Sequence, residues 1–279
     1  GIILILICFY NFLIIKNCCK YFSSFMSLNL IVYEYTSMQA HTNDNLEAMA
    51  KQLYDYWFVQ FDFPDNNGMP YKSNGGAMLW NEKIKRNIPE GWKVVSLPEI
   101  AVFTNGLACQ KYRPIDDNKL PVIKIKEMHD GISSETEYVK SSIPESVKVY
   151  NGDILFSWSA SLEVMQWAYG DGGLNQHIFK VTSKNGWPKF FYYYQLLDYV
   201  SVFKRMAEAR KTTMGHITQE HLDQSIIVVP PTKDLVHLMS KRINPILDKI
   251  VANSSEIIEL QKQRDNLLPL LMNGQICVG

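Results

Sequence analysis

The side chains best suited to contact a polyanion cluster in the string EARKTTMGHIT at residues 208–218. Cationic and hydroxyl groups bind phosphates, and Gly215 gives the chain the freedom to turn among them. We therefore predict a flexible, locally basic loop that contacts a nucleic-acid backbone. Its candidate contact residues are Arg210, Lys211, Thr212, Thr213 and His216.

Side chains able to read base edges occur together at Asn175, Gln176 and His177. Asn and Gln can each form two hydrogen bonds with the major-groove edge of adenine. The same groups also satisfy hydrogen bonds inside proteins, so a structural role for these residues is at least as good an interpretation.

Further cations could follow the phosphates of a duplex. Lys111 and Arg113 come shortly after the turn signal Asn105-Gly106 and should lie on an exposed loop, either in contact with DNA or simply solvated. Lys124 and Lys126 alternate with isoleucines in LPVIKIKE, the pattern of a half-buried strand whose outer face carries both lysines. That face is either a phosphate-tracking stripe or, as we slightly favour, the solvated side of an antiparallel strand.

Two serines complete the set of DNA-contact candidates. Ser157 and Ser159 alternate around Trp158 in DILFSWS, so on a strand both hydroxyls share one face and the indole lies on the other. We expect Trp158 in the core, because large aromatic side chains are mostly buried.

Enzymatic chemistry has little support in the sequence. There is no Gly-rich phosphate loop and no methyl-donor or amino-methyltransferase motif, and the six histidines form no HxxxH pair. Pro64-Asp65 and Asp117-Asn118-Lys119 could suggest a metal-dependent nuclease, but both strings lie in turn-like stretches. We expect no catalytic residue, no metal and no cofactor, and we predict a binding module.

Composition restricts the class of protein. The 279 residues include 28 Lys and Arg and 28 Asp and Glu, so the zero net charge excludes a histone-like polybasic binder but allows a local basic patch. The five cysteines form no CxxC, which argues against a zinc ribbon or a disulfide framework and indicates a reducing compartment, the cytoplasm. Residues 1–15 are almost wholly apolar but shorter than a membrane span, so we favour a segment that is not a membrane anchor.

Local patterns in the first half of the chain predict two helices. The first covers 46–61, with Thr42 or Asn43 as its cap and an apolar stripe at 3–4 spacing that begins at Ala50. The second is short and runs from a capping box at 96–99 to about Asn105-Gly106.

The central part of the chain, residues 107–183, is predicted to be rich in strands. EVMQWAY and NQHIFKV should pair across a Gly-rich turn at 170–173. Pro188 should open a helix, and SIIVVPP at 225–231 should form a buried strand.

The C-terminal segment has the most regular pattern. Asn244 and Pro245 are expected to start a helix that reaches about Leu268, because Pro245 should kink or break any helix that continues from upstream. Apolar residues in 4–3 alternation form a coiled-coil seam, with one amphipathic helix packed on its own domain as the alternative. The predicted interaction residues are Ile246, Ile250, Asn253, Ile257, Leu260 and Leu267, and Asn253 should fix the register.

Several strings, in this order, make the chain resemble the DNA-specificity subunit of type I restriction–modification systems over about residues 43–279. They are NLEAMAKQLYDYWFVQFDFP, IPEGWKVVSL, GDILFSWSASLEV, LNQHIFKV, the HIT…L…IIVVPP segment and RDNLLPLLMNGQI. Members of that family usually carry two target-recognition domains, each followed by a long helix, and the two helices form an antiparallel coiled coil. This sequence resembles the end of the first helix, one complete recognition domain and the final helix.

The resemblance implies an α+β fold, in which a mixed recognition domain is flanked by long helices that form a coiled-coil arm. The implied divisions are an unassigned apolar segment at 1–41, the end of a spacer helix at 42–62, a linker at 63–83, a DNA-binding target-recognition domain at 84–232 and a C-terminal helix at 233–279.

The resemblance also implies a function and partners. The chain would be a non-catalytic specificity subunit, or half-subunit, that recognises double-stranded DNA and directs methyltransferase (modification) and restriction subunits to the target site. The alternative is a helical interaction scaffold, or a truncated remnant, that no longer binds DNA. Because the predicted first helix is too short to cover the seam, we expect a homodimer through the C-terminal helix or capture by methyltransferase subunits.

Overall fold

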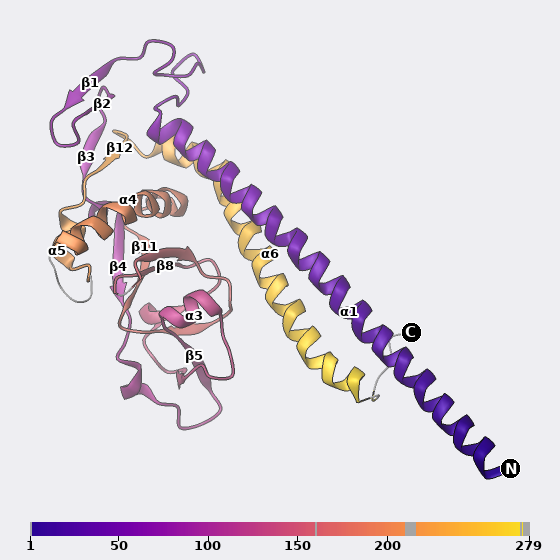
Figure 1. Ribbon diagram of the computed structural model, residues 1–279. Coiled ribbons are helices and arrows are strands. Elements are labelled where there is room, and N and C mark those ends of the chain that lie inside the picture. Colours follow the sequence, from indigo (N-terminus) through magenta and orange to yellow (C-terminus); the bar gives the residue numbers. More distant parts are fainter. Residues whose placement is uncertain (1, 160, 210–215, 274, 276–279) are drawn as a thin grey trace. The chain divides into compact units, whose positions relative to one another are not determined.

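The computed structural model describes residues 2–159, 161–209, 216–273 and 275. It divides into two units, one formed by residues 45–252 and the other by residues 1–44 with 253–279. Strands and helices are both present, which confirms the predicted α+β class (Figure 1). Each of the two long helices contributes residues to both units.

Helix α1 spans Ile2–Tyr54 and continues into a π-helical turn, Asp55–Val59. The predicted start at Thr42 or Asn43 is wrong, because both residues are interior helix positions. The Thr42 hydroxyl donates to the carbonyl oxygen of Met38 at 2.9 Å, and the Asn43 side chain is buried. A hydroxyl that bonds one turn back within a helix is not available to cap its beginning.

Helix α6 spans Asp234–Met272 and runs unbroken through Pro245, so the predicted start at Asn244 and the predicted kink are both wrong. The buried residues of α6 on either side of this proline belong to the core of unit 45–252; they are Val236, Met239, Ile243, Leu247 and Ile250. Packing of one continuous face offsets the hydrogen bond that proline removes from the helix.

In the unit formed by residues 1–44 and 253–279, α1 and α6 lie side by side (Figure 1). Asn253 is fully buried, and its amide nitrogen donates to Asn43 Oδ1 at 2.8 Å. The Asn43 amide in turn donates to Ser254 Oγ at 3.1 Å, and the Tyr35 hydroxyl donates to Glu256 Oε1 at 2.9 Å. A buried amide pair of this kind favours one helix register over others.

These contacts correct the expectation that the seam of the C-terminal helix lacks a partner within the chain. Ile250 and Asn253 are buried, Ile246, Ile257 and Leu260 are half-buried, and Leu267 is 38 % exposed. The first helix is therefore long enough to lie against the seam, because it starts at residue 2 and not near residue 43.

The first four-stranded sheet of unit 45–252 is antiparallel, with strand order β4-β11-β8-β9. Its strands are β4 (Ala101–Asn105), β11 (Ile178–Ser183), β8 (Ile154–Ser157) and β9 (Glu163–Gln166). The predicted strand in DILFSWS is confirmed as β8, whereas the predicted pairing of EVMQWAY with NQHIFKV is wrong. β8 lies between β9 and β11 because it pairs with both.

The capping box at Ser96 is confirmed, since the Ser96 amide donates to Glu99 Oε1 at 2.8 Å. Helix α2 nevertheless covers only Leu97–Ile100, and the predicted extension to Asn105-Gly106 is the strand β4. Pairing of β4 with β11 along five residues outweighs the local helix signal, because the strand backbone is satisfied by a partner distant in sequence.

The second four-stranded sheet has the order β6-β5-β10-β7. Its strands are β6 (Tyr138–Lys140), β5 (Lys119–Ile123), β10 (Gly172–Leu174) and β7 (Lys148–Val149). The predicted Gly-rich turn at 170–173 is thus partly strand. A Cβ on Gly173 would lie 2.6 Å from Val139 Cγ2, so the close approach of these strands requires glycine.

Two shorter sheets and the remaining helices complete this unit. The predicted helix after Pro188 and the predicted strand in SIIVVPP are both confirmed. The sheets pair β1 (Met78–Asn81) with β2 (Arg86–Pro89) and β3 (Lys93–Val95) with β12 (Ile227–Val229). The helices are η2 (Cys109–Tyr112), α3 (Ile125–Asp130), η3 (Glu145–Val147), α4 (Lys189–Ala209) and α5 (Gln219–Asp223).

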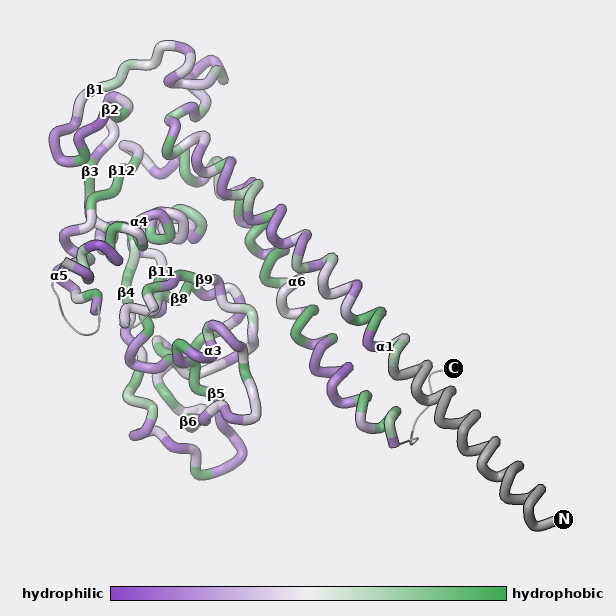
Figure 2. Tube along the Cα trace, viewed as in Figure 1, coloured by the Kyte–Doolittle hydropathy of each residue, from purple (hydrophilic) through white to green (hydrophobic). Residues whose placement is uncertain are grey.

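The core of unit 45–252 is strongly aromatic. The Phe58 ring lies 5.1 Å from that of Phe191, and Phe203 stacks on Phe156 at 5.9 Å. The predicted apolar stripe that begins at Ala50 is buried throughout. Figure 2 shows mostly hydrophobic residues along β5, β8 and β12. In the part of the chain whose side chains are described, no helix has a long enough apolar stretch to cross a membrane.

Candidate functional site

Four strands of the first sheet begin or end at the same place. The antiparallel register puts Phe179 opposite Asn105, Ile178 opposite Ser157, and Ser157 opposite Glu163. The segments that leave the sheet there are therefore neighbours, although up to roughly seventy residues separate them in the sequence. Connecting segments usually lie at the protein surface, so this end of the sheet should meet solvent. We call this end of the sheet the loop end and define it by Asn105, Trp158, Gln176, His177 and His216.

Trp158 joins the segments of the loop end. Its indole Nε1 donates to Asn105 Oδ1 at 3.1 Å, and its ring centroid lies 5.6 Å from those of His177 and His216. Its backbone amide donates to the His177 carbonyl at 3.3 Å, and its carbonyl accepts from the Ile217 amide at 2.9 Å. Trp158 is half-buried at the edge of the core, so the expected core position is only partly correct. Trp158 therefore contacts both imidazoles of the loop end.

The three predicted base-reading residues divide into a buried one and two more accessible ones. Asn175 is 5 % exposed, its Oδ1 accepts from the His177 backbone amide at 3.3 Å, and its backbone amide donates to the Ile123 carbonyl at 3.0 Å. Gln176 is half-buried and His177 is exposed, with 3.4 Å between Gln176 Nε2 and His177 Nε2. This geometry agrees with the structural alternative for Asn175 and leaves Gln176 and His177 as contact candidates.

The two predicted serines are buried. Ser157 is fully buried, and its Oγ accepts from the Glu163 amide at 3.1 Å and donates to the carbonyl oxygen of Ser161. Ser159 is 6 % exposed. Ser157 therefore holds the β8–β9 connection in place, and its side chain is not free to reach a DNA groove.

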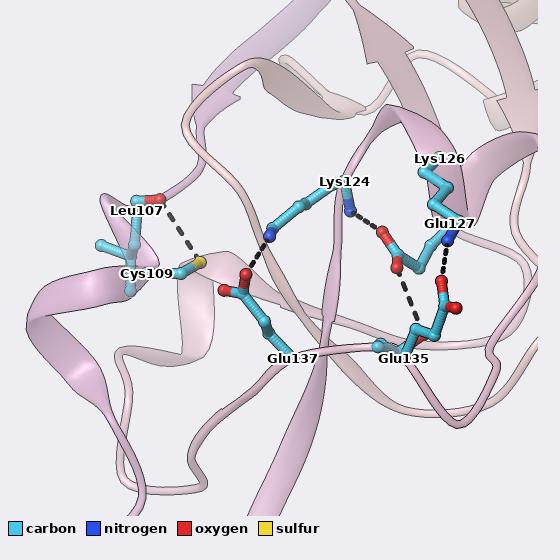
Figure 3. A network of polar contacts seen from close by, with 8 residues as sticks. Leu107, Cys109, Lys124, Lys126, Glu127, Glu135 and Glu137 are labelled. Atoms are coloured by element: carbon cyan, nitrogen blue, oxygen red, sulfur yellow. Dashed lines mark hydrogen bonds and ion pairs between the residues drawn. The ribbon is translucent and has the colours of Figure 1, made fainter.

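Lys124 and Lys126 do not share a strand face, because β5 ends at Ile123 and Lys124 caps α3 (Figure 3). The Lys124 ammonium lies 2.7 Å from Glu137 Oε1, and the Lys126 ammonium lies 2.6 Å from Glu135 Oε2. The hydrogen bond from Lys126 lowers the pKa of Glu135, and the one from Lys124 lowers the pKa of Glu137. Both predicted phosphate contacts are thus neutralised by neighbouring carboxylates.

A buried carboxylate completes this network. Glu127 is 5 % exposed, and it accepts from the Lys124 backbone amide at 3.1 Å and from Thr136 Oγ1 at 3.2 Å. Together with the two ion pairs, these bonds tie the segment before β6 to α3 (Figure 3). The alternation that predicts a strand through Lys126 is overridden by this helix cap, since Glu127 at the third helical position satisfies the free amide at the helix start.

Lys111 and Arg113 differ from this pair. Lys111 lies in η2 and Arg113 directly follows it; both are exposed, and neither forms an ion pair with another described residue. The segment before η2 lies next to the loop end, because Leu107 forms a β-bridge with Asn175, the residue that precedes Gln176. These two cations are accessible for phosphate contacts.

Two exposed cations near the loop end are not indicated by the sequence patterns. Lys204 and Arg205 follow Phe203, which stacks on Phe156 one residue before the end of β8. Within the described part of the chain they form no ion pair. The sequence of this aromatic helix does not predict which part of the sheet it packs against. The position of these two cations near the loop end is therefore known only from the fold. His216 is exposed at the loop end, whereas Arg210, Lys211, Thr212 and Thr213 lie outside the described residues.

Among the described residues, no group of three or more His, Cys, Asp and Glu side chains is arranged to hold a metal ion. One cleft of unit 45–252 has a volume of about 310 Å³, and its lining includes Tyr54, Arg86 and Asp198. The carboxylate of this cleft, Asp198, already forms an ion pair with the Lys51 ammonium at 3.1 Å. The loop end is thus the stronger candidate for contact with an extended polar ligand.

Comparison with known proteins gives one consistent family. The family model described as "Type I restriction modification DNA specificity domain" matches residues 89–266. The chain is 24 % identical over 250 residues to the MjaIX type I restriction enzyme specificity subunit of Methanocaldococcus jannaschii, covering 85 % of this chain and 54 % of that protein. It is 22 % identical over 197 residues to the EcoBI specificity subunit of Escherichia coli, covering 68 % and 40 %.

A solved structure has a similar fold. The S subunit of a type I restriction–modification system from M. genitalium matches with a TM-score of 0.55 at 13 % identity, covering 88 % of this chain and 58 % of that chain. The chain spans about half the length of the curated relatives it matches.

Proposed function

Because this chain belongs to the type I restriction modification DNA specificity family, we propose that it recognises a specific double-stranded DNA sequence. The observation that carries the proposal is the extent of the family match, which covers residues 89–266 and so includes both four-stranded sheets. The protein would supply recognition and no chemistry of its own.

The loop end is the proposed DNA-contacting surface. It presents Gln176 and His177, whose side chains can bond to base edges, around the ordered ring of Trp158. Exposed cations occur in the segments next to it, at Lys111, Arg113 and the 204–205 pair. Phosphate contacts that set the register and polar groups that face the bases are the two parts that sequence-specific DNA binding needs.

The proposed partners are those of a specificity subunit. We infer that methyltransferase (modification) and restriction subunits assemble with this chain, which would direct them to the bound site in the cytoplasm. Cofactors for methyl transfer or DNA translocation would be held by those subunits.

We also propose that two copies act together, each supplying one recognition domain. On α1, Ile31, Tyr33 and Met38 are each more than half exposed and could receive another helix. A two-fold pair would read a palindromic split site. Replacing Ile31 and Met38 by Asp should then abolish association measured by light scattering.

The function is tested by selecting target sequences from a randomised duplex pool with the full chain, alone and with a type I modification subunit. We expect enrichment of one sequence. Replacing Arg210 and Lys211 by Ala should weaken binding to all duplexes alike and reduce the salt slope by roughly one to two units, at about 0.9 per phosphate contact. Absence of binding and enrichment in both conditions would contradict the proposal and favour a helical scaffold or remnant.

A further inference from the structure

One histidine faces the β8–β9 turn, although no sequence pattern indicates it. We define this turn by its described residues Trp158, Ser159, Ser161 and Leu162. His129 lies near the end of α3, and its Nε2 is 3.2 Å from Glu163 Oε2 and 3.3 Å from Ser161 Oγ. The contact joins the helix that follows β5 of the second sheet to the start of β9 of the first sheet.

The arrangement of these three side chains excludes a catalytic relay. In a Ser-His-acid triad the hydroxyl and the carboxylate contact different nitrogens of the imidazole. Here both oxygens contact Nε2. An ionised carboxylate can only accept, so Nε2 must carry the proton, and a single N–H group then faces Glu163 and Ser161 together. Such a group holds two oxygens in place and moves no proton between them.

One carboxylate oxygen of Glu163 lies next to this imidazole. Its Oε2 atom is buried, and within the described residues no hydrogen bond of regular geometry reaches it, whereas the imidazole lies at ion-pair distance. A carboxylate oxygen removed from water is costly without a donor or a counter-charge. On α3, Lys126 is paired with Glu135 and Asp130 is an acid, so His129 is the described residue of this helix whose N–H group reaches Glu163.

The β8–β9 turn therefore has two anchors. One belongs to the sheet, because Ser157 Oγ accepts from the Glu163 amide and donates to the Ser161 carbonyl. The other is His129, which reaches the side chains of Ser161 and Glu163 from α3. Between them the turn carries Trp158, whose ring contacts those of His177 and His216 at the loop end.

We propose that His129 is a positioning residue for DNA reading, because it holds the turn that carries Trp158 in place. The inference rests on the proposed function. It assigns to α3 a role that is separate from phosphate binding, since the lysines of α3 are paired with glutamates. Loss of the N–H group should relax the choice of target and leave sequence-independent binding in place.

The test compares three full-length variants with the wild type. His129→Ala removes the donor, and His129→Gln replaces the Nε2–H by an amide N–H at similar reach. His237→Ala, an exposed histidine on α6, is the matched control. The measurements are the ratio of affinities for the selected target and for a randomised duplex, the melting temperature, and amide hydrogen exchange at residues 161–163.

We expect His129→Ala to lower the affinity ratio about fivefold to tenfold, as for one lost hydrogen bond, and to speed exchange at residues 161–163. Affinity for the randomised duplex should change by less than about twofold, and His129→Gln should restore the ratio. The inference is overturned if the ratio is unchanged in His129→Ala, if His129→Gln is equally impaired, or if both affinities fall together with the melting temperature. A wild-type chain without any target preference, but with faster exchange in His129→Ala, would refute the proposed function and leave the anchor intact as a folding contact alone.

Discussion

Two basic regions of unit 45–252 show how differently the same residue types can be used. Around α3, Lys124 and Lys126 each lie within 2.7 Å of a glutamate oxygen. Around η2, Lys111 and Arg113 are exposed and form no ion pair with another described residue. Whether a lysine is available to bind phosphate therefore depends on the carboxylates that the fold brings next to it.

The contrast extends to the polar residues at the loop end. Asn175 is buried and bonded to the backbone of its own turn, whereas its neighbour Gln176 is half-buried and points its amide toward His177. Adjacent residues of similar chemistry thus divide into one that supports the fold and one that can meet a ligand.

The largest expected effect comes from replacing Asn175 and Gln176 one at a time. Asn175→Ala should lower the free energy of unfolding by about 1–3 kcal/mol, because the buried Asn175 side chain and its hydrogen bond with the His177 amide are lost, and should keep the target preference. Gln176→Ala should leave the melting curve unchanged and relax preference at one base pair by about 1–3 kcal/mol. Melting curves and target selection on both variants check this. Each variant serves as the control for the other, and identical phenotypes would remove the distinction.

The η2 cations should give the next largest effect. Replacing Lys111 and Arg113 by Ala should weaken binding to all duplexes and reduce the salt slope by roughly one to two units, at about 0.9 per phosphate. The matched control replaces the exposed Lys83 and Lys93, which removes the same charge elsewhere. Filter binding across a salt series measures the slope. Equal slopes for the two double variants would mean that only net charge matters.

The α3 lysines should give the smallest effect, on stability. The pKa values of Glu135 and Glu137 are lowered in the folded state by their lysine partners, so this contribution is present above the unfolded-state pKa, near 4.5, and is lost as pH falls through the lower folded-state values. Replacing Lys124 and Lys126 by Ala should slightly lower the melting temperature at neutral pH. The difference from wild type should shrink in acid, and the salt slope for DNA should stay unchanged. A salt slope reduced as far as in the η2 variant would mean that DNA displaces the glutamates.

Local sequence was sufficient for elements whose signals are short-range. The Ser96 capping box, the helix after Pro188 and the strand in SIIVVPP depend on neighbouring residues and are where the patterns place them. The family resemblance was also visible in the sequence, because several strings occur in one order. The predicted Lys111, Arg113 and His216 are exposed, as a turn signal and a glycine-containing loop imply.

Tertiary structure decided what depends on distant partners. β4 is a strand because β11 pairs with it, and α6 crosses Pro245 because its buried face packs on both sides of the proline. Lys124 and Lys126 are paired with glutamates that follow α3, and the Asn43 side chain accepts a hydrogen bond from Asn253, more than two hundred residues away in the sequence. A periodic pattern specifies which face of an element is apolar, but the energy that selects its partner comes from contacts between residues far apart in the sequence.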